Sequence, residues 1–179
     1  SNIPYKIVGG VNFYSRKEVK DMLSYLKTIA NGQDDLAVRR IINVPKRGIG
    51  ATSITKVANY AAEHEMNFYS ALCEAAEIPG LGKAAAKIEP FVLFVQSMKA
   101  KSKLKPVSEL LQEIIETTGY VRELEAEGTD EAEARIENID ELISKAVDYE
   151  EAQEHPTLDG FLEEVALVAD IDSLDADSD

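Results

Sequence analysis

The sequence has a single cysteine, two histidines and no apolar run that approaches the length of a membrane span. One cysteine cannot form a disulfide framework, so we expect a reducing cytoplasm as the compartment and Cys73 as a buried thiol. Crossing a bilayer takes about 20 consecutive apolar residues, and we expect neither a membrane segment nor a signal peptide. These absences argue against membrane proteins and disulfide-rich secreted scaffolds.

Patterns typical of catalytic and metal sites are absent as well. The run Gly82-Lys83-Ala84 lacks the upstream glycine and the hydroxyl of a nucleotide-binding phosphate loop. His64 and His155 are far apart, and neither stands at a metal-ligand spacing. Glu133 and Glu137 lie one helical turn apart, but no Glu-x-x-His motif accompanies them. We therefore predict no catalytic residue, no metal site and no cofactor bound by this chain.

Charge is distributed unevenly along the chain. The formal net charge is −14, yet residues 1–60 contain 10 Lys and Arg against 4 Asp and Glu. Residues 106–179 contain 3 Lys and Arg against 24 Asp and Glu. Because an acidic surface repels DNA, any nucleic-acid binding would be confined to the more basic face. The alternative is that the acidic surface serves solubility alone.

Apolar residues at helical spacing predict an all-α fold of eight or nine helices. Ser15 and Glu18 have the spacing of a capping box at the start of the first helix. Pro90 lies inside the fifth predicted helix and should bend or split that helix. Residues 1–14 are expected to be an extended lead-in with one short strand. Residues 15–170 form the helical domain, and residues 171–179 an acidic tail without periodicity.

A tight turn that opens a helix is predicted between residues 44 and 57. Two glycines flank an apolar residue that should point into the core, two basic residues precede them, and two hydroxyls and a lysine follow. In chain order these are Lys46, Arg47, Gly48, Ile49, Gly50, Thr52, Ser53 and Lys56. Glycine permits a close backbone approach, and a helix N-terminus favours an anion, so the pattern suits a phosphate oxygen.

The Gly-hydrophobe-Gly pattern recurs at Gly80-Leu81-Gly82, followed by Lys83. Both copies resemble the turn of helix-hairpin-helix modules, which hold the nucleic-acid backbone without recognising bases. We therefore predict contacts to the DNA backbone at both turns, including Lys83 at the second. The alternative is that the glycines serve helix packing only.

Three longer stretches resemble one family. Residues 13–21, 40–50 and 135–142 are similar to segments of the 2B subdomain of UvrD/PcrA/Rep-type superfamily-one DNA helicases, closest to its PcrA-like members. The likeness extends from about Ile3 to Asp175. It implies that this chain is an insertion within the second motor domain, with residues 3–12 belonging to that domain and the acidic tail leading back to it.

The resemblance also implies a function. The subdomain would contact double-stranded DNA ahead of the fork, swivel between orientations that regulate unwinding, and dock other subdomains and accessory repair proteins. ATP and Mg²⁺ would bind elsewhere in the parent 3′–5′ helicase, in the bacterial cytoplasm and at the nucleoid. The implied contacts are Lys46, Gly48, Ile49, Gly50, Thr52 and Ser53 at the first turn and Gly80, Leu81, Gly82 and Lys83 at the second. The alternative function is a protein-docking module whose glycine turns are purely structural.

Overall fold

The structure is a computed structural model that describes residues 12–177, with the side chains of residues 12–174. This part of the chain is all helical, which confirms the predicted fold class. None of its helices is both long enough and apolar enough to cross a membrane. The helices, in order, are η1 (Phe13–Ser15), α2 (Lys17–Ala30), α3 (Asp35–Ile41), α4 (Ala51–Glu63), α5 (Phe68–Cys73), η2 (Ala75–Glu77), α6 (Ala84–Ser102), α7 (Val107–Thr118), α8 (Tyr120–Glu127), α9 (Asp130–Ala152) and α10 (Leu158–Asp177).

Several helices begin at a side chain that accepts a backbone hydrogen bond. Asp34 caps α3, Asn67 caps α5 and Thr129 caps α9, each by accepting the amide three residues later. The predicted capping box at Ser15 is wrong, because α2 begins at Lys17 and the Ser15 hydroxyl donates to a carbonyl before η1. The predicted strand lies mostly outside the described residues.

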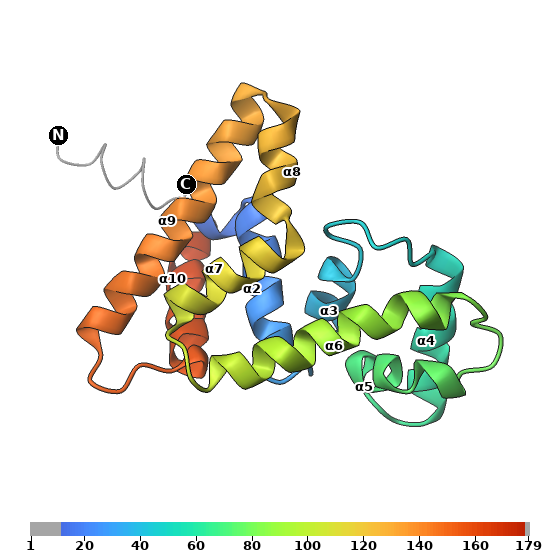
Figure 1. Cartoon of the computed structure of the whole chain (residues 1–179). Coiled ribbons are helices and arrows are strands. Elements are labelled where there is room, and N and C mark those ends of the chain that lie inside the picture. The colour runs from blue at the N-terminus through green and yellow to red at the C-terminus, as the bar shows by residue number, and fades with distance from the viewer. Residues whose placement is uncertain (1–11, 178–179) are drawn as a thin grey trace, which may run out of the picture.

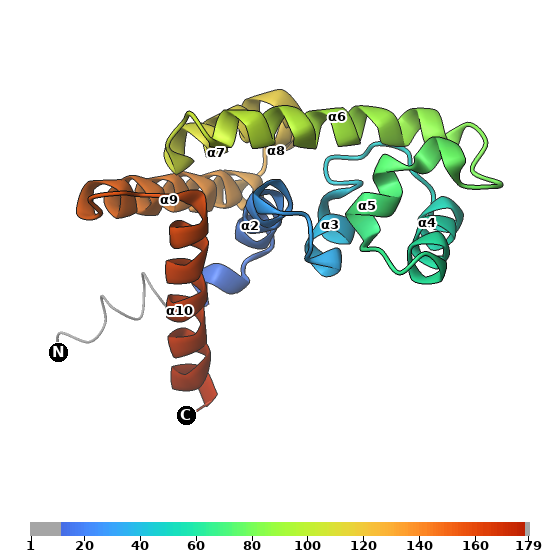
Figure 2. The ribbon, with the colours of Figure 1, turned by 90° about the horizontal axis from the view of Figure 1, so that it is seen from below.

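The helices form two parts joined by the long helix α6 (Figure 1). One part, here called the turn lobe, contains α3, α4, α5 and the first half of α6, residues 34–94. The other, the helical body, contains α2 and residues 107–177, and Figure 2 shows α10 projecting steeply from α9. Buried apolar side chains form one continuous core through both parts.

Three local expectations differ from the structure. Helix α6 continues through Pro90, which is exposed, so of the predicted bend or split the split does not occur. Helix α10 runs to Asp177, beyond the predicted end at residue 170, because no glycine or proline interrupts that stretch. Cys73 is exposed rather than buried, since it is the last residue of a short helix.

Buried polar side chains join α2 to three other helices. Asp21, 1% exposed, accepts from Arg40 Nε of α3 at 2.8 Å and from the Tyr120 hydroxyl of α8 at 2.6 Å. Burial, and then the hydrogen bond to Asp21, raise the pKa of Tyr120 above its ordinary value. Glu18 accepts from Asn138 Nδ2 of α9 at 2.6 Å. Asn138, in one of the family-like stretches, thus has a structural role.

Candidate nucleic-acid interface

The first glycine turn connects α3 to α4 and is held by the side chain of Asn43. Gly48 has a φ of +77°, a left-handed conformation that glycine adopts without strain. Ile49 is only 3% exposed, as expected from the sequence. Asn43 Nδ2 donates to the carbonyl oxygen of Ile49 at 2.6 Å, and Asn43 Oδ1 accepts from its amide at 3.0 Å. The turn is therefore a fixed element, and Asn43 is a residue that the sequence pattern did not single out.

The N-terminus of α4 is open. Its N-cap residue, Gly50, is extended, with φ −71° and ψ 160°, and no side chain caps the helix. The first helical hydrogen bond runs from the Ile54 amide to the Gly50 carbonyl at 3.0 Å. Within residues 12–177, the amides of Ala51, Thr52 and Ser53 are thus left without a protein acceptor. Free amides at the positive end of the helix dipole favour an anion such as a phosphate.

Positive charge surrounds both turns. Lys46, Lys56 and Lys83 are exposed, and none of them forms an ion pair within the described part of the chain. No Asp or Glu occurs in residues 44–57 or 79–88. The carboxylates that dominate the net charge of the protein therefore do not occur within either turn segment.

Arg47, which the sequence predicts as a contact to the DNA backbone, is bonded to groups of the protein itself. Its guanidinium donates to the carbonyls of Ile41 and Ile42 at 2.7 and 3.1 Å and to the Tyr25 hydroxyl at 2.8 Å. It also lies 4.8 Å from the centre of the Phe91 ring. A cation at the end of α3 is attracted by the negative end of the helix dipole and supplies donors to its last carbonyls. Arg47 therefore braces the turn from within.

The second turn opens α6 and differs from the first. Gly80 and Gly82 both have positive φ, +83° and +57°, and Leu81 between them is 6% exposed. Lys83 is the N-cap residue and is itself in a helical conformation. The amides of residues 84–86 donate to carbonyls three residues earlier, at 3.0 to 3.4 Å. The first amides of α6 are therefore not free for a ligand.

A cleft of about 510 Å³ lies beside the first turn. Two exposed lysines, Lys46 from the turn and Lys87 from α6, are part of its lining, so the cleft continues the basic surface of the turn. Its lining comprises Pro45, Lys46, Arg47, Ala86, Lys87, Pro90, Phe94, Thr117 and Thr118.

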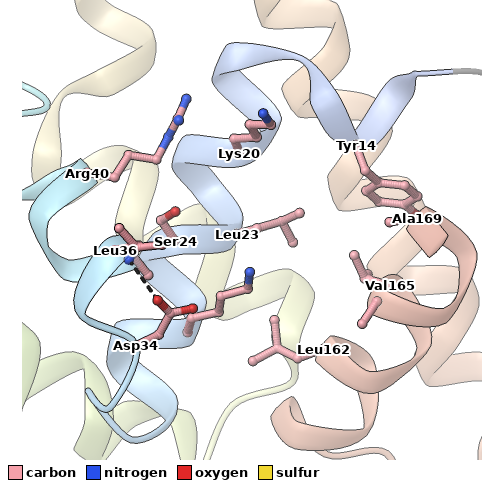
Figure 3. Close-up of a pocket in the computed structure, with 13 residues that line it drawn as sticks. Tyr14, Lys20, Leu23, Ser24, Asp34, Leu36, Arg40, Leu162, Val165 and Ala169 are labelled. Carbon is pink, nitrogen blue, oxygen red and sulfur yellow. Dashed lines mark hydrogen bonds between the residues drawn. The ribbon is translucent and has the colours of Figure 1, made fainter. Parts of the chain in front are cut away.

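A second hollow, of about 480 Å³, lies between α2, α3 and α10 (Figure 3). Leu162 and Val165 of α10 give it an apolar side. Of its polar residues, Asp34 caps α3 and Arg40 is bonded to a buried carboxylate, so neither is free for chemistry. Among the described residues, no group of three or more His, Cys, Asp or Glu side chains could hold a metal ion.

Known proteins align with nearly the whole length of this chain. Residues 1–178 match the family model described as the UvrD-like helicase C-terminal domain. The ATP-dependent DNA helicase PcrA of Staphylococcus aureus is 44% identical over 180 residues, and that of Bacillus subtilis is 42% identical over 175. The alignments cover 99% and 98% of this chain but 25% and 24% of the relatives, so the chain spans about a quarter of their length. The chain belongs to the UvrD-like helicase C-terminal domain family.

Proposed function

We propose that this chain is the 2B subdomain of a PcrA-type ATP-dependent 3′–5′ DNA helicase, and that it binds the backbone of duplex DNA. The observation that carries the proposal is the uncapped N-terminus of α4 beside exposed lysines in a segment without carboxylates. A phosphate at this place would accept hydrogen bonds from the free amides and would be attracted by the dipole and the ammonium groups.

The first turn supplies the main contacts in this proposal. They come from the amides of residues 51–53, from Lys46 and from the exposed Thr52. The second turn adds the exposed Lys83. Arg47 is left out because its guanidinium donates to protein groups. Contacts of this kind carry no base information, so binding would be independent of sequence. Because the duplex would be held through this subdomain, its orientation in the parent would regulate unwinding during replication and repair.

The ATP and Mg²⁺ of the parent would bind in other subdomains. Residues 82–84 do not fit a nucleoside triphosphate, because they lack the hydroxyl that would hold Mg²⁺. The amides of residues 84–86 also already donate to protein carbonyls. By itself this chain would neither hydrolyse ATP nor unwind DNA, and an ATPase assay of the purified chain checks this.

An NMR titration of the chain with a short DNA duplex tests the proposal. The amides of residues 48–53 should shift first, and those of residues 80–83 should follow. Two turns would neutralise about 2–4 phosphates, so log K should fall with log salt at a slope of about −2 to −4. A binding curve that ignores salt, or that strongly prefers one base sequence, would contradict it.

Lys46→Ala sharpens this test. Loss of one phosphate contact should reduce the salt slope by about 0.9 and weaken binding equally on every sequence. Lys20→Ala is the matched control, because Lys20 is an exposed lysine on α2, in the helical body. If both variants lose the same affinity, the effect comes from total charge and not from the turn.

A second function, protein docking, has support from the other half of the molecule. Helix α10 exposes the apolar side chains of Leu167, Ile171 and Leu174, which are 65%, 52% and 68% exposed. Accessory repair proteins or other subdomains of the parent would bind this acidic part, in the cytoplasm and at the nucleoid. Reversing the charge of the exposed Glu133 and Glu137 should then abolish partner capture but leave duplex binding intact. Loss of duplex binding in that variant would argue against separate surfaces.

A further inference from the structure

The similarity of the two glycine turns extends to the segments around them. Each turn follows a short helix with a capped N-terminus, α3 before the first and α5 before the second. Each leads into a helix in which a lysine directly precedes a fully buried residue. The first pair is Lys56-Val57 and the second Lys87-Ile88, and both apolar residues are 0% exposed. The turn lobe thus contains two corresponding units.

The lysine of each unit contacts the glycine turn of the other unit. Lys56 Nζ donates to the carbonyl oxygen of Gly80 at 2.8 Å, and Lys87 Nζ donates to that of Gly48 at 3.3 Å. A Cβ added to Gly48 would have the Lys87 side chain as its nearest neighbour, and one added to Gly80 that of Lys56. Each lysine therefore lies along the turn of the other unit.

This reciprocal contact has an electrostatic consequence. The carbonyl oxygens of Gly48 and Gly80 carry partial negative charge beside the proposed phosphate site. An ammonium group on each oxygen offsets that charge and fixes the orientation of the peptide group. Both turns are then held with one geometry before any ligand arrives, which lowers the entropic cost of binding.

We infer that the two turns form one composite site for two phosphate groups of a DNA backbone, in which Lys56 and Lys87 are positioning residues that lock each turn to the opposite unit. The inference rests on the proposed function and goes further, because it couples the turns. It also changes the role of Lys56 from the predicted phosphate contact to a brace, and it adds Lys87, which the glycine pattern did not include.

A double-mutant cycle measures the coupling. Lys56→Met, Lys87→Met and the double variant are titrated with the same short duplex at several salt concentrations. Each single change should weaken binding about fivefold, within the usual range for coupled neighbours, and the double variant should lose little more than one single variant. The salt slope should stay near that of the unchanged chain. Additive losses, each with a slope reduced by about 0.9, would show two independent phosphate contacts and overturn the inference.

A measurement on the free chain separates the brace from DNA binding. Lys87→Met should shift the amide resonances of residues 48–50, and Lys56→Met those of residues 80–82. Arginine at either position should restore both the resonances and the affinity, because it keeps a charged donor. The matched controls are Lys46→Met and Lys83→Met. Within residues 12–174 these exposed lysines do not bond to the opposite turn, so its resonances should stay unchanged.

The outcomes are distinguishable. If the lysine variants leave the opposite turn unchanged in the free chain, the brace is absent and the inference fails while duplex binding stands. If the unchanged chain does not bind a duplex, the proposed function fails. The inference of a composite phosphate site then fails as well, whatever the free-chain spectra show.

Discussion

Two sets of charged side chains, one in the turn lobe and one on α2 of the helical body, differ in whether the protein itself pairs them. In the turn lobe, Lys46 and Lys83 are exposed and lie in segments without carboxylates. In the helical body, Asp21 and Glu18 of α2 are buried and accept hydrogen bonds from neighbouring helices. A charge that is paired inside the protein fixes the arrangement of helices. A charge that is left unpaired at the surface remains available to a ligand, and this comparison gives four tests.

The largest expected effect is on the buried pairing. Asp21→Ala leaves the Tyr120 hydroxyl and the Arg40 guanidinium without their shared acceptor, and we expect a loss of about 3 kcal/mol in the free energy of unfolding. Urea denaturation measures it. Glu141→Ala, which removes an exposed carboxylate of α9, is the control and should change stability by less than about 0.5 kcal/mol. Equal losses of stability in the two variants would show that the buried carboxylate contributes no more to stability than an exposed one.

The next effect tests packing within the body. A Cβ at Gly160 would overlap the hydroxyl of Tyr149, which is buried and packs against Phe161. Gly160→Ala should therefore cost about 2 kcal/mol of stability, because the tyrosine has little room to move. Glu163→Ala, at an exposed position of the same helix, is the matched control. A thermal melt of both variants distinguishes them, and an unchanged melting temperature for Gly160→Ala would show that Tyr149 is free to move.

A smaller effect tests the backbone of the turn lobe. Gly48→Ala forces a side chain into the left-handed region and should cost about 1 kcal/mol, with loss of duplex binding at the turn. Asn59→Ala, at an exposed position inside α4, is the control. If the two alanine variants are equally stable, the conformation of Gly48 is not what constrains this turn.

The smallest effect concerns a surface pair. The hydrogen bond from Lys101 to Glu113, at 2.9 Å, holds the pKa of Glu113 below its usual range. Its contribution to stability is present above the unfolded pKa, which is about 4.3, and is lost as pH falls through the folded pKa. An NMR titration of the Glu113 carboxyl should show the lowered midpoint, and Lys101→Met should raise it. If the Glu113 midpoint is the same in Lys101→Met, another group causes the lowered pKa of Glu113.

The positions of the helices and the buried residue of each turn were predictable from the sequence. The roles of several charged side chains, such as Arg47, were not. Ile49 and Leu81 lie between glycines in a pattern that signals a turn, and both are buried. Arg47 looked like a DNA contact because it is basic and precedes a glycine. In the structure it bonds the last carbonyls of α3 and the hydroxyl of Tyr25, 22 residues away. No local pattern contains that partner.

The sequence by itself determined the all-α class, most helix limits and the two glycine turns, because helical periodicity and the left-handed conformation of glycine depend on neighbouring residues. Only the tertiary structure decided which cations face outward and which turn each lysine reaches. Lys87 and Gly48 are 39 residues apart and meet because α3, α4, α5 and α6 pack into one lobe. Partners of this kind depend on packing, which no local spacing encodes.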